Sequence, residues 1–485
     1  MPDELTVDTT TIPGLLVVRL PLHEDSRGWF KENWQREKML AAGLPDFGPV
    51  QNNMSLNARR GATRGIHTEP WDKLVSVATG RVFAAWVDMR DGASFGEVFY
   101  LEMGPDTAVF VPRGVGNSYQ ALEDGTVYSY LVNDHWRPGI SYPALHLGDP
   151  TCAIPWPIPL DQAEISEKDH ANPTLDAVTP VAPKRTLIIG ANGQLGRALH
   201  HQFPDADLAD LVADPDRGVA ALDASDPAAL AAIAWRDYSV VLNAAAYTAV
   251  DAAETPEGRV AAWAANATAP ALLARAADER GFTLVHYSSE YVFDGTRALH
   301  TEDEPLSPLG VYAQSKAAGD VAVATARRHY LVRTSWVVGE GRNFVRTMHD
   351  LATRGLSPAV VEDQVGRLTF TQELAHATSH LLSTRPNYGT YNVTNSGEPM
   401  TWFDVAAEVF TLAGRDRRDV SRTTTEVYGS GKLLAPRPQF SVLDLSKLVS
   451  TGFKPEPALT ALVRYCLHDL QATSATTTER HNHRG

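Results

Sequence analysis

Cysteine is nearly absent from this chain of 485 residues, which contains only Cys152 and Cys466. The two lie far apart in the sequence and do not form the closely spaced pair typical of a cysteine metal site. So few cysteines fit a reducing compartment, where disulfides are rare. We therefore expect a cytoplasmic protein with no metal site.

The chain also lacks long apolar runs and an excess of positive charge. No apolar stretch approaches the length of about 20 residues that spans a bilayer, and the start, Met1–Glu4, lacks the basic and then apolar pattern of a signal peptide. The formal net charge is −15, whereas nucleic acid or an anionic membrane calls for a basic face. We expect neither partner, and we expect clustered arginines to hold any anionic substrate.

The composition that is present is that of a soluble globular protein, with 44% hydrophobic and 21% charged residues. A chain of this length is too long for one core, so it predicts two or three domains. Three prolines separated by small polar residues follow His170 and indicate a linker. We predict a first domain at 1–172, a proline-rich linker at 173–184, a second domain at 185–471 and a disordered tail at 472–485.

The first third of the chain reads as β structure. Short apolar runs separated by Gly, Pro and Asp occur at Val17–Leu20, Leu74–Ala78, Val82–Val87, Val98–Leu101, Ala108–Val111 and Val127–Val132. Many short strands at fairly even spacing favour an antiparallel sandwich or barrel. Before about residue 160, only Trp34–Ala42 shows a helical pattern of comparable strength.

After Lys184 the pattern changes to alternating strands and helices. The apolar run Thr186–Ile189 leads directly into Gly190–Gly196, which contains three glycines and precedes an apolar helix. Glycines at this spacing let the backbone approach a pyrophosphate at the positive end of a helix, although a simple tight turn also uses them. Further strands are predicted at Val240–Ala244, Thr283–Ser288, Tyr330–Thr334 and Ala359–Val361, with helices at Pro227–Ala234 and Val260–Arg280. The pattern predicts a doubly wound α/β fold of the Rossmann type.

Tyr312 and Lys316 lie four residues apart on a predicted helix, so both side chains project from one face. A phenol holds its proton to about pH 10. We expect the ammonium group one turn away to lower the pKa of Tyr312, which makes the phenol a proton donor to a carbonyl oxygen. Ser289, at the end of the preceding strand, can hold the same oxygen. Hydride transfer to a ketone needs this arrangement, but an isolated Tyr-x-x-x-Lys is common and usually structural.

A series of motifs in the second half carries a family resemblance. The motifs are Gly190–Gly196, Asn243–Asp251, His286–Gly295, Tyr312–Asp320 and Arg333–Trp336. Over about residues 185–470 the chain resembles dTDP-4-dehydrorhamnose reductase, an extended short-chain dehydrogenase. The resemblance implies Ser289, where the family usually has threonine, Tyr312 and Lys316 as the catalytic set. Glu290 replaces the usual aspartate and Leu368 the usual proline.

The same resemblance implies the ligand contacts of the second half. The cofactor contacts would be Gly190, Asn192, Gly193, Gln194, Leu195, Gly196, Asp223, Ala244, Ala245, Ala246, Tyr312 and Lys316. The stretches Asp363–Gly366 and Arg437–Pro438 would meet the sugar nucleotide, with contacts from Trp336, Gln364 and Arg437. The resemblance favours NADPH, whereas an acidic residue after the second strand, Asp210 or Asp214, would favour NADH. NADH therefore stays possible.

The first half carries a second resemblance, through Asp25–Glu32, Gln51–Ser55, Arg64–His67 and Val111–Gly114. Over about residues 8–172 these motifs resemble the cupin family of dTDP-4-dehydrorhamnose 3,5-epimerases. The resemblance implies His67 as the general base oriented by Asp169, Tyr130 as the acid on the opposite face of the sugar, and Lys73 beside the enolate oxygen. The implied substrate contacts are Arg27, Glu32, Gln51, Asn53, Arg59, Arg64 and Asn117.

These roles also make chemical sense by residue type. Histidine is a base near neutral pH, as removal of a proton next to a ketone requires. A lysine beside the carbonyl stabilises the developing charge. Each residue also has a structural reading, since a lone histidine after a strand usually packs, Tyr130 alternates with Tyr128 as a core residue would, and Lys73 can be a solvated edge residue. The front half departs from its family at Asn117, usually histidine, at Trp136, usually tyrosine, and in a shorter loop between His67 and Lys73.

Together the two halves predict a bifunctional enzyme. The cupin half would epimerise dTDP-4-dehydro-6-deoxyglucose at C3 and C5, and the Rossmann half would reduce C4 to give dTDP-L-rhamnose. The expected partners are the dTDP-sugar and a second copy of the chain, as a dimer through the cupin domain. One alternative is a reductase for a related dTDP-6-deoxysugar with a mono-epimerase half. Another is a cupin half that only binds sugar nucleotides.

Overall fold

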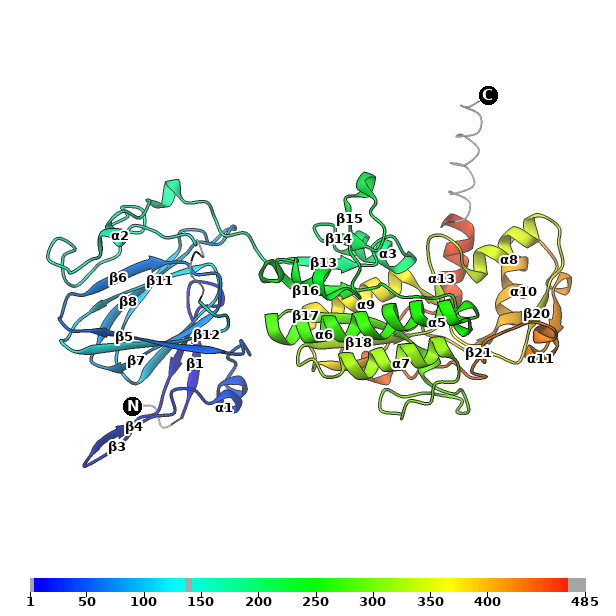
Figure 1. Ribbon diagram of the computed structural model, residues 1–485, viewed down its shortest axis with the longest axis horizontal. Coiled ribbons are helices and arrows are strands. Elements are labelled where there is room, and N and C mark those ends of the chain that lie inside the picture. The colour runs from blue at the N-terminus through cyan, green and yellow to red at the C-terminus, as the bar shows by residue number, and fades with distance from the viewer. Residues whose placement is uncertain (1–3, 137–138, 140–141, 470–485) are drawn as a thin grey trace, which may run out of the picture. The chain divides into compact units, whose positions relative to one another are not determined.

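The computed structural model describes residues 4–136, 139 and 142–469. The chain divides into two compact units, Met1–Lys184 and Arg185–Gly485 (Figure 1). Each unit has its own hydrophobic core and is described by itself below. The tail predicted at 472–485 lies outside the described residues.

The first unit consists of two antiparallel sheets that pack face to face (Figure 1). One sheet has the strand order β1 (Thr6–Thr9), β2 (Leu16–Arg19), β10 (Thr107–Val111), β7 (Lys73–Thr79), β12 (Thr126–Val132) and β5 (Gln51–Asn57). The other has the order β6 (Thr63–His67), β11 (Val115–Ala121), β8 (Val82–Asp88) and β9 (Val98–Met103). The remaining elements are the hairpin β3 (His23–Asp25) and β4 (Gly28–Phe30) and the short helices α1 (Arg36–Ala41) and α2 (Glu167–His170). The predicted all-β cupin domain is confirmed.

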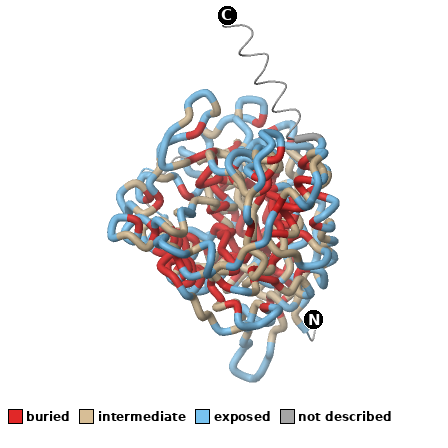
Figure 2. The backbone as a smooth tube through the Cα atoms, turned by 90° about the vertical axis from the view of Figure 1, so that its right-hand side faces the viewer, coloured by how far each residue is buried: buried red, intermediate tan, exposed pale blue. Residues whose placement is uncertain are grey.

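The core of the first unit lies between its sheets because alternate residues of each strand point inward. Val75 and Val77 of β7 pack with Trp86 of β8 and Tyr128 of β12, and all four are buried. Burying an apolar side chain of this size stabilises the fold by about 1.5–3 kcal/mol. The buried parts of the chain run through the interior and the loops around them are exposed (Figure 2). This layering leaves one end of the sandwich for polar side chains.

Residues 173–184, predicted to be a free linker, pack largely on the first unit. The short helix η1 (Leu175–Ala177) buries Leu175 in a cluster with Ile66 and Met89. The backbone N–H of Leu175 donates to Asp149 Oδ2 at 2.7 Å. The N–H of Val181 donates to Met89 O at 2.7 Å, and Val181 O accepts the N–H of Asp91 at 3.0 Å, just after β8. The sequence prediction missed these contacts because Leu175, Val178 and Val181 lie singly among small and polar residues.

The second unit is organised around a seven-stranded parallel sheet (Figure 1). Its strand order is β15 (Val219–Ala221), β14 (Asp207–Asp210), β13 (Arg185–Ile189), β16 (Tyr238–Asn243), β17 (Thr283–Ser289), β18 (His329–Thr334) and β23 (Gly389–Asn392). Successive residues of β13 serve opposite faces, since Leu187 and Ile189 belong to one core cluster and Ile188 to the other. This confirms the doubly wound Rossmann fold.

Helices cover both faces of the parallel sheet. Their bounds are α3 (Gln194–Gln202), α4 (Pro227–Ala231), α5 (Pro256–Trp263), α6 (Ala269–Arg280), α7 (Val311–Val323) and α9 (Thr371–Thr384). Leu199 of α3 and Leu374 of α9 share one core cluster, whereas Leu273 of α6 and Val323 of α7 share the other. The predicted helix Val260–Arg280 is interrupted by a wider turn over Ala264–Thr268. The sheet therefore has a buried interior and a carboxyl edge at which β13, β16 and β17 end.

A smaller lobe beside the carboxyl edge completes the second unit. It contains α8 (Phe344–Thr353), α10 (Trp402–Leu412), α11 (Thr425–Gly429) and α13 (Ala458–Arg464), whereas α12 (Ser446–Ser450) packs on β23 of the main sheet. Its short strands are β19 (Val337–Val338), β20 (Ala359–Val361), β21 (Val365–Gly366), β22 (Thr369–Phe370), β24 (Met400–Thr401) and β25 (Ser421–Thr423). We expected Ala359–Val361 in the main sheet, but it pairs with β25 in this lobe. The seventh strand of the main sheet is β23 instead.

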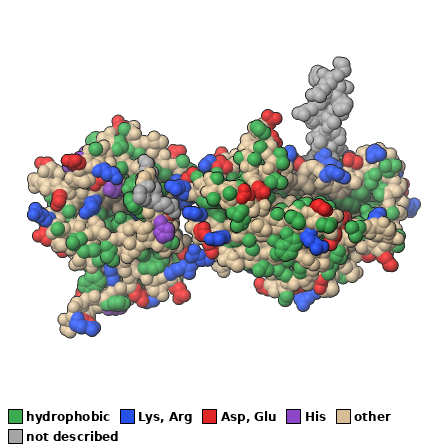
Figure 3. All heavy atoms as spheres, in the orientation of Figure 1, with side chains coloured by type: hydrophobic (Ala, Val, Ile, Leu, Met, Phe, Trp, Pro, Cys, Tyr) green, Lys and Arg blue, Asp and Glu red, His purple; other side chains and the backbone are tan. Residues whose placement is uncertain are grey.

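Within the described residues, no helix combines the length and the apolar character needed to cross a bilayer. On the face drawn in Figure 3, lysine and arginine side chains are interspersed with aspartate and glutamate. Among the described residues, no group of three or more His, Cys, Asp or Glu side chains is placed to hold a metal ion.

Candidate active sites

A histidine–aspartate pair lies at the open end of the first unit. His67 is the last residue of β6, and its Nε2 lies 2.7 Å from Asp169 Oδ1. Ser166 Oγ accepts the N–H of Asp169 at 3.1 Å and so fixes the start of α2. Burial by itself raises the pKa of Asp169, but hydrogen bonds from His67, Gly65 and Ser166 outweigh it and the pKa is lowered. The aspartate is therefore ionised and holds one ring nitrogen of His67.

Lys73 and Glu69 form a buried ion pair beside this dyad. Lys73 begins β7 and is only 2% exposed, so the reading as a solvated edge residue is wrong. Its Nζ donates to Glu69 Oε2. Sequence reasoning did not single out Glu69, because a glutamate in a loop is usually a solvated residue. The pair places one positive and one negative charge inside the barrel.

Two tyrosines face the same space. Tyr130 of β12 lies opposite Asn53 of β5, and burial followed by the charge of Glu69 raises its pKa to about 12. Tyr142, which the sequence prediction missed, has its ring centroid 6.3 Å from that of His67. Burial and then Glu69 also raise the pKa of Tyr142. Both phenols therefore stay protonated. No periodic pattern marks Tyr142, because it lies in an irregular segment.

Polar side chains of β5, β6 and β11 line the rest of the barrel end. Gln51 Nε2 donates to Asn53 Oδ1 at 2.8 Å, and Gln51 Oε1 accepts the N–H of Trp136 at 3.2 Å. Arg64 Nε donates to Asn57 Oδ1 at 3.2 Å. Asn117 lies opposite His67 and accepts a hydrogen bond from Tyr128. Gln51, Asn53, Arg64 and Asn117 thus all lie on strands at this end of the first unit, and their role as substrate contacts stays a prediction.

Three predicted substrate contacts lie elsewhere on the surface. Arg27 sits in the β3–β4 hairpin, which extends away from the sheets (Figure 1), and it pairs with Asp25. Glu32 pairs with Lys38 at 2.6 Å, and Arg59 is exposed in the turn between β5 and β6. Within the described part of one chain, none of the three contacts the His67–Asp169 pair.

The turn between β13 and α3 is packed so closely against the neighbouring backbone that it needs glycine at two positions. Gly190 has φ +86°, and a Cβ there would lie 2.4 Å from the backbone N of Ala245. A Cβ on Gly196 would lie 2.1 Å from Gly190 O. Asn192, Gly193, Gln194 and Leu195 then open onto a cavity at the N-terminus of α3. A dinucleotide pyrophosphate fits this cradle, since backbone N–H groups and the helix dipole point into it.

The cavity has a volume of about 1060 Å³ and extends from the glycine turn to Ser289, Tyr312 and Lys316. Ala244 and Ala246 line it, whereas Ala245 packs into a core cluster. Asp223 does not line the cavity, and its Oδ1 accepts the backbone N–H of Ser225. The predicted cofactor contacts are thus mostly brought together.

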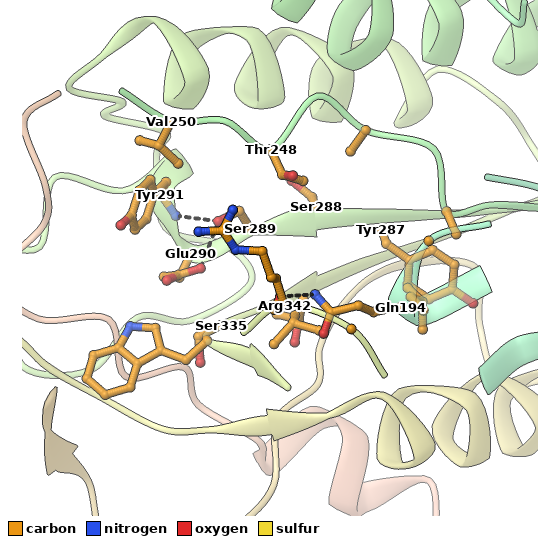
Figure 4. A pocket seen from close by; sticks show the side chains of 18 of the residues that line it. Gln194, Thr248, Val250, Tyr287, Ser288, Ser289, Glu290, Tyr291, Ser335 and Arg342 are labelled. Atoms are coloured by element: carbon orange, nitrogen blue, oxygen red, sulfur yellow. Dashed lines mark hydrogen bonds between the residues drawn. The ribbon is translucent and has the colours of Figure 1, made fainter. Parts of the chain in front are cut away.

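The expected pKa effect of Lys316 on Tyr312 is wrong for this structure. The Lys316 ammonium donates to the backbone oxygen of Tyr287 at 2.6 Å, and burial lowers its pKa to about 8. Burial and then the carboxyl of Glu290 raise the pKa of Tyr312. Glu290 is itself buried and accepts the hydroxyl of Ser289 (Figure 4). Tyr312 therefore stays protonated near neutral pH.

The far wall of the cavity belongs to the smaller lobe. Trp336 and Trp402 stack at 3.7 Å between ring centroids and both line the cavity. Gln364 accepts the indole N–H of Trp402 and lies behind it. Arg437 pairs with Asp251 at 2.9 Å and adjoins Tyr291, which lines the cavity. Trp402 was not predicted, because an aromatic residue at a helix start more often signals packing.

Two cavity arginines were also missed by the sequence prediction. Arg342 projects into the cavity beside Gln194 (Figure 4). Arg346 of α8 lines the cavity, and its Nε is buried without a hydrogen-bond partner among the described residues. A buried guanidinium N–H without a partner is costly unless a ligand supplies an acceptor. These arginines suit a phosphate-bearing ligand.

Comparison with known families agrees with this geometry. Residues 184–472 match the sequence model of a family described as the RmlD substrate binding domain. Residues 9–177 match that of dTDP-4-dehydrorhamnose 3,5-epimerase. Over 180 residues the chain is 46% identical to the Protein RmlC homolog of Streptococcus pyogenes, covering 36% of this chain and 90% of that protein. The chain belongs to both families.

The match to relatives of the RmlD half covers nearly the whole length of each relative. The chain is 39% identical over 303 residues to a probable dTDP-4,6-dihydroxy-2-methyloxan-3-one 4-ketoreductase of Streptomyces antibioticus, covering 61% of this chain and 99% of that protein. A crystal structure of dTDP-4-dehydrorhamnose reductase from Bacillus anthracis in complex with NADP has 31% identity and a TM-score of 0.53, with 59% of this chain and 99% of that chain covered. The RmlD family and the 3,5-epimerase family are thus joined in one polypeptide.

Proposed function

We propose that the chain is a bifunctional enzyme of dTDP-L-rhamnose biosynthesis. The first unit epimerises dTDP-4-dehydro-6-deoxyglucose at C3 and C5, and the second reduces the C4 ketone with NADPH. The observation that carries the proposal is that each unit holds the reacting groups its family requires. These are His67 with Asp169, Lys73 and Tyr130 in the first unit, and Ser289, Tyr312 and Lys316 in the second.

In the first unit, His67 removes the proton next to the ketone. Asp169 holds the Nε2 proton of His67, which leaves Nδ1 as the base. Lys73 stabilises the negative oxygen that develops, and Glu69 keeps the ammonium in place. Tyr130, whose raised pKa keeps it protonated, returns a proton to the opposite face of the sugar.

In the second unit, Tyr312 supplies the proton for the new hydroxyl group. The nicotinamide, when bound, supplies a hydride to C4. Tyr312 donates its proton to the C4 oxygen, and the Lys316 ammonium stabilises the phenolate that remains. Ser289 holds the same oxygen. Arg342 and Arg346 bind the pyrophosphate of the sugar nucleotide.

The residues that would surround the adenosine ribose of the cofactor favour NADPH over NADH. The carboxylate of Asp210 accepts the backbone N–H groups of Asn192 and Leu211, so both of its oxygens are engaged. Arg217 lies beside them and donates to Asn192 Oδ1 at 3.0 Å. An arginine at this position suits a 2′-phosphate. NADH stays usable because neither group blocks a bare ribose.

Incubating the enzyme with the ketosugar and NADPH in heavy water tests the proposal. We expect deuterium at C3 and C5 without NADPH, and dTDP-L-rhamnose when NADPH is added. A His67→Ala variant should lose exchange and keep reduction of a preformed dTDP-4-dehydrorhamnose. No exchange and no NADPH oxidation by the parent would contradict the proposal.

A second candidate function is the reduction of a related dTDP-6-deoxysugar with a mono-epimerase front half. The relative from Streptomyces antibioticus bears the name of such a ketoreductase, and Asn117 and Trp136 depart from the epimerase pattern. One deuterium in the sugar would support this function. No exchange, with His67→Ala indistinguishable from the parent, would support a cupin half that only binds.

We also propose that the chain forms a homodimer through the first unit. The edge strand β5 exposes Met54 and Leu56, which are 69% and 65% exposed. The β3–β4 hairpin carries Arg27 away from its own barrel, where a second copy can use it. Analytical ultracentrifugation of the parent and of a Met54→Glu, Leu56→Glu variant tests the dimer.

A further inference from the structure

Glu290 is a buried carboxyl group that the reduction described above does not use. It directly follows Ser289, begins η6 (Glu290–Val292), is 4% exposed and lines the cavity. Ser289 Oγ donates to Glu290 Oε2 at 2.7 Å. In the described part of the chain, no lysine or arginine forms an ion pair with this carboxyl. Burial therefore outweighs the hydrogen bonds from Ser289 and from the backbone, and raises the pKa of Glu290 to about 7.

The hydrogen bonds of Ser289 depend on the charge of Glu290. A serine hydroxyl has one proton to donate and two lone pairs to accept with. One lone pair of Ser289 receives the N–H of Tyr291 at 3.2 Å, and the proton goes to Glu290 (Figure 4). While Glu290 is ionised, Ser289 has no proton left for a ketone oxygen, which can only accept.

Protonation of Glu290 reverses this arrangement. The protonated carboxyl can donate to the second lone pair of Ser289, which otherwise adjoins the Tyr312 hydroxyl, so the hydroxyl proton of Ser289 is released toward the cavity. A ketone oxygen then receives two hydrogen bonds, one from Ser289 and one from Tyr312. Two donors stabilise the negative charge that develops on this oxygen during hydride transfer better than one.

We propose that Glu290 is a positioning residue that sets the direction in which the Ser289 hydroxyl donates, and that reduction proceeds while this carboxyl is protonated. The role rests on the proposed C4 reduction. Glu290 takes its proton from solvent while the cavity is open and keeps it through turnover. The proton that reaches the C4 oxygen still comes from Tyr312, so the stoichiometry of the reduction is unchanged.

The other groups around Glu290 do not change charge near neutral pH. Burial, and then in each case the charge of Glu290, raises the pKa of Tyr312 and of Tyr291. Lys316 loses its proton only near pH 8, because burial lowers its pKa to about 8. The remaining charged groups on the adjoining elements are paired with each other, as Arg437 with Asp251 and Arg333 with Asp320. A change in activity near pH 7 that Glu290→Gln removes and Glu302→Gln keeps therefore reports on Glu290.

The first test compares the pH dependence of kcat for NADPH oxidation in the parent, in Glu290→Gln and in Glu302→Gln. The amide of Glu290→Gln always has an N–H to donate to Ser289, so we expect its kcat to stay level through pH 7 and to fall only near pH 8. The kcat of the parent and of Glu302→Gln should fall to about a tenth of its low-pH value by pH 8. Glu302 is a matched control, because it is a partly buried carboxyl with a raised pKa that accepts the N–H of Asn392, away from Ser289.

The second test measures the Glu290–Ser289 coupling without turnover. The folded pKa of Glu290 lies above its unfolded value of about 4.5, so the parent should lose Tm relative to Glu290→Gln as pH rises from about 4.5 to about 7. The gap should be constant above that range. Repeating the comparison in a Ser289→Ala background should move the upper end of the range to higher pH, because a hydrogen bond that favours the ionised carboxyl is gone.

The outcomes separate this role from the reduction itself. No NADPH oxidation by the parent overturns the proposed reduction. Turnover with the same pH profile in the parent and in Glu290→Gln overturns the role of Glu290 alone. The role is also overturned if the Tm difference develops over the same pH range in the Ser289→Ala background. The two side chains would then be uncoupled.

Discussion

Tyr312 keeps its proton in the reductase cavity because burial and the neighbouring Glu290 outweigh every favourable interaction of its phenolate. Lys316, which was expected to lower this pKa, donates instead to the backbone oxygen of Tyr287. A phenol that stays protonated is available as the proton donor to a ketone oxygen. Single residues in this site are therefore tuned by burial first and by charge second.

Replacing Tyr312 with phenylalanine should stop reduction and leave epimerisation intact. The variant lacks the proton donor for C4, and loss of a general acid costs about 10²–10⁴-fold in rate. NADPH oxidation measures the loss, and deuterium exchange into the sugar measures what remains. Tyr330→Phe is a matched control, because this buried tyrosine donates to Pro386 O away from the cavity. Loss of exchange in Tyr312→Phe would contradict the assignment of two separate sites.

Replacing Asn117 with histidine should leave the exchange pattern unchanged or accelerate it. Asn117 accepts a neutral hydrogen bond from Tyr128, and a histidine can accept the same bond and also carry charge. A charge-assisted bond that tightens in the transition state gains about tenfold in rate. Mass spectrometry of the sugar made in heavy water gives the rate and the number of deuterium atoms. A slower double exchange would contradict a functional role for this position.

At the scale of elements, the segment after His170 packs on the first unit and does more than connect the two units. Its helix η1 buries Leu175 against Ile66, Met89 and Leu145, and Val181 extends the backbone pairing at Met89. The segment therefore acts as a strap across one end of the first unit. Its position ties the chain down next to α2, which carries Asp169.

Removing the strap should destabilise the first unit. We expect a fragment ending at Asn172 to unfold at lower denaturant concentration than one ending at Lys184, because the loss exposes the cluster around Leu175. A Leu175→Ala change in the longer fragment should cost about 2–4 kcal/mol. Urea unfolding followed by fluorescence measures both. Asp176→Ala, at an exposed position of the same helix, serves as the control. Equal stability of the two fragments would contradict the role of the strap.

Both folds could be predicted from the sequence because their cores follow regular apolar patterns. The strands β5, β6 and β11 were not predicted, although they carry Gln51, Arg64 and Asn117. Their inward side chains are polar and line the site, so the apolar alternation that marks a strand is broken there. Tyr142 and Glu69 were missed for a related reason, since only the folded chain brings irregular segments beside His67.

At the scale of the whole molecule, the reacting groups of each proposed site come from one unit. His67, Lys73 and Tyr130 lie before the boundary at Lys184, and Ser289 and Tyr312 lie after it. Each unit also buries its own core. The chain therefore combines two folds, each of which carries the reacting groups of one proposed site.

Cutting the chain between Lys184 and Arg185 should preserve both activities. We expect fragments 1–184 and 185–485 to be produced separately in folded form and, when mixed, to convert the ketosugar and NADPH to the final product. The rate at low enzyme concentration, measured against the intact chain, shows whether the covalent link contributes. Failure of both fragments to fold alone would contradict the division into independent units.

The stacked indoles of Trp336 and Trp402 give the reductase cavity a built-in optical reporter. Two aromatic rings 3.7 Å apart and nearly parallel couple electronically, so they contribute a distinct near-ultraviolet circular dichroism signal. A ligand that enters the cavity changes the surroundings of this pair and so alters the signal. Subtracting the spectrum of a Trp402→Phe variant removes the background from the other tryptophans. Sugar-nucleotide affinity can then be titrated without a label and without turnover.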